Sequence, residues 1–161
     1  MSAGHYDLTA SEGTTAKAQL GEEREIGGAY YVYCKSVGAL AAYAMCTVSN
    51  AGVATAGTTT TSGAKPTLVV IPQFAIAAAD EYFWGWNGGT AIKSHDGVTT
   101  FKVLAENCAT SVKVYTTATD GVLDDDSSGT DLIHNLCLTE TVTTQEAADC
   151  VAVGRLGTNL A

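Results

Sequence analysis

The chain has 161 residues, 46% of them hydrophobic, and this length fits one domain with room for an arm. The formal net charge is −9, and the eight Lys and Arg residues are scattered singly. The sequence therefore lacks the basic stripe that neutralises nucleic-acid phosphates and the basic cluster that holds an anionic membrane. We expect neither nucleic acid nor a membrane as a partner.

Residues 1–25 form a polar stretch without a sustained hydrophobic period, and it ends in the charge run of residues 22–25. We expect residues 1–25 to be an extended arm that is ordered only when something holds it. Residues 26–161 are expected to form a single β-rich domain. The first seven residues lack the basic and apolar regions of a signal peptide.

The alternation of bulky residues in 29–34 predicts a strand. A strand–turn–strand pattern then occurs twice, in residues 43–55 and 112–124. In each copy a β-branched run breaks at a glycine, Gly52 or Gly121, and resumes with valine. Two hairpins of one design indicate a β-barrel or β-sandwich built from short strands.

Further strands are expected at residues 67–71, where Pro72 marks an edge or bulge, and at residues 132–138 and 148–153. Asp96-Gly97 predicts a hairpin turn between residues 91–93 and 98–104. Residues 145–148 are compatible with one helical turn. The fold class predicted is all-β: a small β-sandwich or β-barrel of short antiparallel strands with an extended N-terminal arm.

Cysteine usage indicates a reducing compartment. The number of cysteines is odd, they are widely spaced, and no C-x-x-C pair occurs. We interpret them as reduced thiols that serve as small buried apolar residues in a protein made in a cytosol. They are Cys34, Cys46, Cys108, Cys137 and Cys150.

Two short strings could carry chemistry. Ser94-His95-Asp96 contains the residue types of a catalytic triad, but three successive residues near a turn point apart, and Asp96 already has a role in the turn. Asp124, Asp125 and Asp126 could offer oxygen ligands to Ca²⁺, although they depart from the calcium-loop pattern. A solvated acidic loop is the alternative. We expect no catalytic residues and no cofactor.

Tyr82, Phe83, Trp84 and Trp86 lie within five residues of a chain that has only three Phe and two Trp. On a strand, Tyr82, Trp84 and Trp86 share one face, and Phe83 takes the other. Such a stripe can stack on sugar rings, or it can anchor a core or a subunit interface. Because each buried ring removes about 150–250 Å² from water, we prefer the core or interface interpretation.

The order of motifs in residues 74–86, 101–105 and 114–126 resembles the head decoration, or cement, proteins of tailed bacteriophages. In that family a phrase similar to AIAA…Y-G-W-x-x-x-x-G is followed by L-Y-T-T-x-x-x-G-x-L. The resemblance covers about residues 70–140. Glu81 and Phe83-Trp84 depart from the simplest form of the phrase.

The resemblance implies a non-enzymatic, β-rich virion protein, often a homotrimer, made in the host bacterial cytoplasm. It would lie on the capsid exterior and clamp neighbouring copies of the major capsid protein. We expect the arm to contact the capsid and order on binding, with its larger residues as the contacts: His5, Tyr6, Leu8 and Leu20. The alternatives are a phage tail or fibre protein, or a receptor-binding module that uses the aromatic stripe for carbohydrate. A small enzyme that uses Cys or His is a third.

Overall fold

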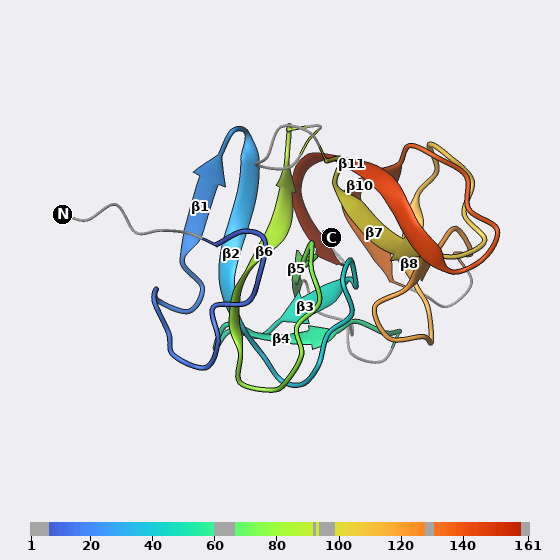
Figure 1. The fold of residues 1–161 in the computed structure, drawn as a ribbon. Helices are drawn as coiled ribbons and strands as arrows, with labels where there is room; N and C mark the ends of the chain where they lie inside the picture. The colour runs from blue at the N-terminus through green and yellow to red at the C-terminus, as the bar shows by residue number, and fades with distance from the viewer. Residues whose placement is uncertain (1–6, 60–66, 92, 94–98, 128–130, 159–161) are drawn as a thin grey trace.

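The computed structural model describes residues 7–59, 67–91, 93, 99–127 and 131–158 (Figure 1). Every regular element in these ranges is a strand, which confirms the all-β prediction, and none of their residues forms a helix that could span a bilayer. The strands are β1 (Glu23–Ile26), β2 (Ala29–Ser36), β3 (Cys46–Val48), β4 (Val53–Ala56), β5 (Thr67–Val70), β6 (Tyr82–Gly89), β7 (Lys102–Ala105), β8 (Val114–Thr116), β9 (Leu123–Asp124), β10 (Leu132–Leu138) and β11 (Glu146–Thr158).

Six strands close into a β-barrel, which we call the first ring. Going round it, β2 pairs with β4, β4 with β3, β3 with β5, β5 with β11, β11 with β6, and β6 with β2 again. Strand β1 adds to β2 outside this closed path. The barrel prediction is thus confirmed.

The remaining strands form a second ring, which shares β11 with the first. Its order is β7, β9, β8, β10 and β11, and β11 returns to β7. With 13 residues, β11 is long enough to serve both rings. Residues 146–149 pair with β7, and residues 154–158 pair with β6 and β5. In Figure 1 the strands up to β6 lie on the left, β7, β8 and β10 lie on the right, and β11 crosses between them.

The two rings repeat one topology. Each ring contains a hairpin, β3–β4 in the first and β8–β9 in the second. The second strand of the hairpin pairs in parallel with an earlier strand: β4 with β2, and β9 with β7. The parallel register is the same: Ser36 lies opposite Ala54, and adding 69 to both numbers gives the pair Ala105 and Leu123. The same shift relates the antiparallel pair Arg24–Tyr31 to Lys93–Thr100. The pattern seen twice in the sequence therefore belongs to a repeated structural unit.

Side-chain alternation divides the core into two clusters. Trp84 and Trp86 on β6 belong to the larger cluster and Phe83 to the smaller, as the predicted alternation requires. On β2, Tyr33 and Cys34 are divided in the same way. The smaller cluster takes residues from β2 to β6 and fills the first ring. The larger cluster joins the outer face of that ring to the second ring.

Two local predictions concern a helical turn and a hairpin turn. The helical turn proposed for residues 145–148 is wrong, because Glu146 begins β11 and pairs with Ala105 of β7. Sheet pairing here overrides a weak local preference for helix. The turn at Asp96-Gly97 lies outside the described residues, although the Lys93–Thr100 bridge flanks it.

Trp86 joins the two rings, and its removal should destabilise the whole fold. The indole of Trp86 stacks on the phenyl group of Phe101, which precedes β7 in the second ring of strands. The aromatic centroids are 4.2 Å apart and the planes differ by 5°. We expect Trp86→Ala to lower the free energy of unfolding by about 3–5 kcal/mol in urea denaturation. Val153→Ala, at a position 78% exposed on β11, should change it by no more than about 0.5 kcal/mol. Equal effects of the two substitutions would contradict this role for the stack.

Candidate functional site

The aromatic stripe is the strongest candidate site, but its two tryptophans are buried and Tyr82 is half-buried. Trp84 is 2% exposed, Trp86 1% and Phe83 0%. Tyr33 on β2 lies between two rings of β6: its centroid is 4.9 Å from that of Trp84 and 5.8 Å from that of Tyr82. β2 and β6 place these side chains together because Tyr33 is the register partner of Trp84.

Residues 7–22, which we call the N-terminal cover, lie over this cluster. Leu8 is buried in it, with 6% of its surface exposed. The Tyr33 hydroxyl donates to Glu12 Oε2 at 2.8 Å and accepts from the Lys17 N–H at 3.0 Å. The Glu12 N–H donates to the Tyr82 carbonyl at 2.7 Å, and the Tyr82 N–H donates to the Gly13 carbonyl at 2.9 Å.

Burial keeps the Tyr33 phenol neutral. It raises the pKa of Tyr33 to about 12, and the nearby Glu12 carboxylate adds to the rise, while the Lys17 N–H opposes it. The neutral phenol is therefore the donor in its bond to Glu12. Trp84 is 2% exposed, so it offers no ring face on which a sugar could stack.

The residues proposed for capsid contact are placed differently from one another. His5 and Tyr6 lie outside the described residues. Leu8 is buried, as stated above, and Leu20 is half-buried against the larger cluster. Leu20 also covers Gly52, where an added Cβ would lie 2.7 Å from the Leu20 Cβ. In this structure, Leu8 and Leu20 therefore contact their own chain.

The acidic loop does not converge on one point. Asp125 Oδ2 accepts from the Ala109 N–H at 2.9 Å, and Asp124 Oδ1 accepts from the Asp126 N–H at 3.1 Å. Partial burial raises the pKa of Asp124, and the neighbouring carboxylates of Asp126 and Glu106 raise it further. Among the described residues, no three His, Cys, Asp or Glu side chains are grouped to hold a metal ion. The geometry gives no support to the calcium hypothesis.

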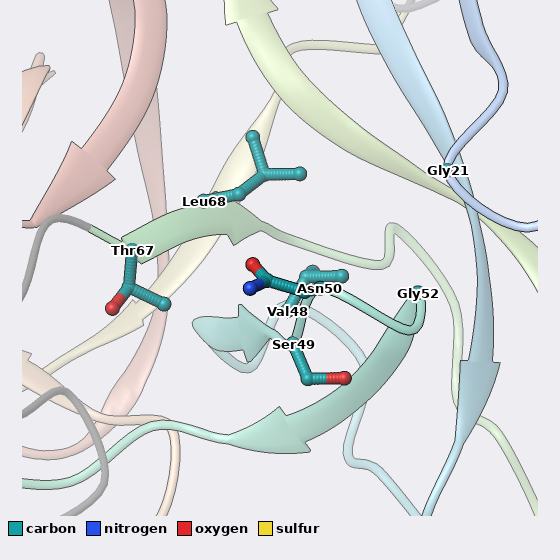
Figure 2. A pocket seen from close by; sticks show the side chains of 7 residues that line it. All are labelled: Gly21, Val48, Ser49, Asn50, Gly52, Thr67 and Leu68. Atoms are coloured by element: carbon teal, nitrogen blue, oxygen red, sulfur yellow. The ribbon is translucent and has the colours of Figure 1, made fainter.

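A hollow of about 440 Å³ opens beside the β3–β4 turn (Figure 2). Val48 and Leu68, which face each other across β3 and β5, form its apolar wall. Its other lining groups are neutral and small: Gly21, Ser49, Asn50, Gly52 and Thr67. Without a charged side chain among these residues, the hollow has neither a nucleophile with its base nor a counter-ion for a charged ligand.

The buried cysteines are poorly suited to nucleophilic catalysis. The Ser94-His95-Asp96 string lies outside the described residues. Cys34, Cys46, Cys108 and Cys150 are buried, and Cys137 is half-buried. Burial raises the pKa of the Cys34 and Cys108 thiols to about 12, and it also raises the pKa of Cys46 and Cys150. These four thiols are protonated at neutral pH and are poor nucleophiles.

Cys137 should therefore be the thiol that reacts in the folded protein. At pH 8 we expect one equivalent of an aromatic disulfide reagent to react quickly in native conditions, and the other four only after unfolding in urea. Cys137→Ser should remove the fast equivalent and leave the slow ones. A thiol that still reacts quickly in the Cys137→Ser variant would contradict the burial of the other four cysteines.

A polar cluster that sequence reasoning missed joins β7, β11 and the segment after β5. Lys102 Nζ lies 2.6 Å from Asp149 Oδ1, which also accepts from the Thr100 hydroxyl at 2.7 Å. The Gln73 amide bonds the backbone N–H and C=O of Lys102, both at 3.0 Å. No local sequence pattern predicts this cluster, because its members come together only when β7 pairs with β11.

The cluster predicts a specific pH dependence. Lys102 and then Thr100 lower the pKa of Asp149 by hydrogen bonding, so the ionised carboxylate stabilises the fold. This contribution is fully present above the unfolded pKa of about 3.9 and is lost as pH falls through the lower folded value. Both side chains are about one-third exposed, which limits the effect to about 0–1 kcal/mol.

We expect Asp149→Asn to destabilise the protein by that amount at pH 7 in urea denaturation, and the difference from the parent chain to vanish near pH 2. Asp120→Asn, which changes an exposed carboxylate in the β8–β9 turn, serves as the control. A difference between Asp149→Asn and the parent that grows as the pH falls would show that the sign is wrong.

The sequence matches no protein-family model, and comparisons with curated proteins and with solved structures found no significant match. The motifs that resemble phage decoration proteins lie in or beside three elements, namely β6, β7 and the β8–β9 hairpin. These elements build the seam between the rings and the second ring itself.

Proposed function

We propose that the chain is a non-enzymatic structural protein of a tailed bacteriophage. It decorates the capsid exterior as a homotrimer and clamps neighbouring major capsid subunits. It is made in the bacterial cytoplasm and becomes part of the virion. The shared strand β11 carries this proposal, because it joins the barrel to a second ring of strands that repeats its hairpin topology (Figure 1).

A clamp must hold two neighbouring surfaces at a fixed distance, so it needs two contact regions on one rigid body. The proposal assigns one contact region to each ring. The Trp86–Phe101 stack and the β6–β11 pairing connect the two rings. Phe83, Trp84 and Trp86 are buried in the core, which favours a structural protein over a ligand-binding module. The burial of four thiols supports a structural role as well.

The net charge of −9 also suits an outer position on the capsid. A part with this charge is repelled by packaged DNA and does not compete for its phosphates. A decoration protein stabilises the shell by mass action, because it binds the assembled capsid and not its separated subunits. At a free concentration 100 times Kd, binding contributes about 2.7 kcal/mol for each site.

The proposal is tested by adding the purified protein to tailed particles of the encoding phage that have expanded capsids and lack this protein. We expect the temperature of capsid disruption to rise and then saturate with protein concentration, and cryo-electron microscopy to show trimeric density on the outer head surface. The Trp86→Ala variant, in which the connection between the rings is weakened, serves as a control and should protect less.

Density on the tail instead of the head would overturn the capsid proposal in favour of a tail or fibre protein. Density on neither, with no change in disruption temperature, would remove both virion roles.

A further inference from the structure

Strand β1 forms an open edge of the sheet in the part of the chain that the structure describes. It pairs with β2 on one side only, and it is the outermost strand on the left of Figure 1. The other ten strands belong to the closed rings and have neighbours on both sides. Strand β1 is therefore the place at which a further strand can be added to this sheet.

The register of β1 on β2 identifies the backbone groups that point outward. The Tyr33 N–H donates to the Glu22 carbonyl at 2.8 Å, so these two residues form a hydrogen-bonded pair directly before β1. Such pairs alternate along an antiparallel ladder, so Arg24 also bonds to β2. The N–H and C=O groups of Glu23 and Glu25 then point away from β2. Within the described residues, no backbone hydrogen bond reaches these four outward groups.

We propose that β1 is the docking site for an extended, basic segment of a different protein, which adds to the sheet as an antiparallel strand. Two residues of this segment, one position apart, lie directly opposite Glu23 and Glu25 and exchange two backbone hydrogen bonds with each. These two residues are Lys or Arg. The site goes beyond the decoration role and does not depend on it.

The charges on β1 select a basic occupant. Glu23, Arg24 and Glu25 are exposed, and alternation places the two glutamates on the same face of the strand. Glu23 forms an ion pair with Arg155 at 2.9 Å, whereas Glu25 has no ion-pair partner among the described residues. Opposite charges that face each other across an antiparallel pair stabilise it, and like charges destabilise it. A cation opposite Glu25 is therefore favoured.

A second copy of β1 is a poor occupant of the same edge. Because Glu23 and Glu25 carry the outward groups, antiparallel registers in which two copies of β1 exchange these bonds set a glutamate opposite a glutamate. When Glu23 of one copy lies opposite Glu25 of the other, Arg24 also lies opposite Arg24. Charged side chains keep edge strands from pairing indiscriminately. On β1 they oppose self-pairing and leave the edge open to a basic segment.

The test uses the isotope-labelled full-length chain and two blocked peptides, Thr-Lys-Val-Lys-Val-Lys-Thr and Thr-Glu-Val-Glu-Val-Glu-Thr. Amide spectra are recorded at low salt up to about 5 mM peptide, because a short strand on one edge binds weakly. We expect the lysine peptide to shift the amides of Glu23 and Glu25 and to slow their exchange with solvent. The Arg24 amide, which already bonds to β2, should keep its exchange rate. The lysine peptide should bind at least about fivefold more tightly than the glutamate peptide.

Two substitutions at Glu25 separate the effect of charge from that of the backbone. Glu25→Lys keeps the outward N–H and should abolish the preference for the lysine peptide. Glu25→Pro removes that N–H at an edge position where a strand accepts proline, and it should weaken the binding of both peptides. Asp120→Lys makes the same charge change as Glu25→Lys at an exposed residue of the β8–β9 turn, and both affinities should stay nearly unchanged. Unshifted amides outside β1 and β2 show that each variant is folded.

Equal affinities for the two peptides, no binding of the lysine peptide, or shifts that fall outside β1 and β2 would overturn the proposal. An equal loss of preference in Asp120→Lys would overturn it too, because the peptide would then respond to net charge alone. Oligomers that form without peptide and dissociate in Glu25→Pro would show that a second copy occupies the edge, which contradicts the proposal. None of these results depends on capsid binding, so the two proposals can fail separately.

Discussion

The close approach of β6 and β11 is the constraint on which the architecture depends. Gly88 and Gly89 lie opposite Arg155 and Gly154, and a Cβ on Gly88 would collide with the carbonyl oxygen of Gly154. Gly88 and Gly89 also have φ values of 91° and 119°, which disfavour other residues. The absence of side chains on β6 here lets the Arg155 guanidinium reach Tyr30, 4.3 Å from its ring centroid, and Glu23 at 2.9 Å.

Because β11 passes from one ring to the other at this crossing, the rings cannot separate without breaking its hydrogen bonds. The Trp86–Phe101 stack reinforces the same seam from the core side. A chain with few large apolar residues thus places aromatic side chains where the barrel meets the second ring of strands. At the other end of the aromatic stripe, the N-terminal cover forms hydrogen bonds with Tyr82 and with the neighbouring Tyr33 of β2. The proposed clamp depends on the stiffness of this seam.

Local patterns predicted much of the fold. The alternation in β2 and β6 and the Gly-Val turns at Gly52 and Gly121 located strands and hairpins, because side-chain period and turn conformation are properties of short segments. That β11 would belong to both rings could not be predicted in this way, because a local pattern does not determine which distant strands a strand pairs with. The Lys102–Asp149 cluster depends on that same pairing. The docking of Leu8 and Glu12 onto the β-strands was not predicted, because residues 1–25 are polar and have no hydrophobic period. The one apolar residue that could have indicated it is Leu8.

Native-state hydrogen exchange at the amides of β11 tests the central claim most directly, which is that one shared strand makes the two rings a single cooperative unit. Residues 148–152 lie in the second ring, residues 154 and 155 pair with β6 of the first, and residues 157 and 158 lie between β5 of the first and β10 of the second. The account predicts that slowly exchanging amides in all of these parts open with one free energy, equal to that of global unfolding. Two distinct opening free energies, with one ring exchanging while the other stays protected, would contradict it.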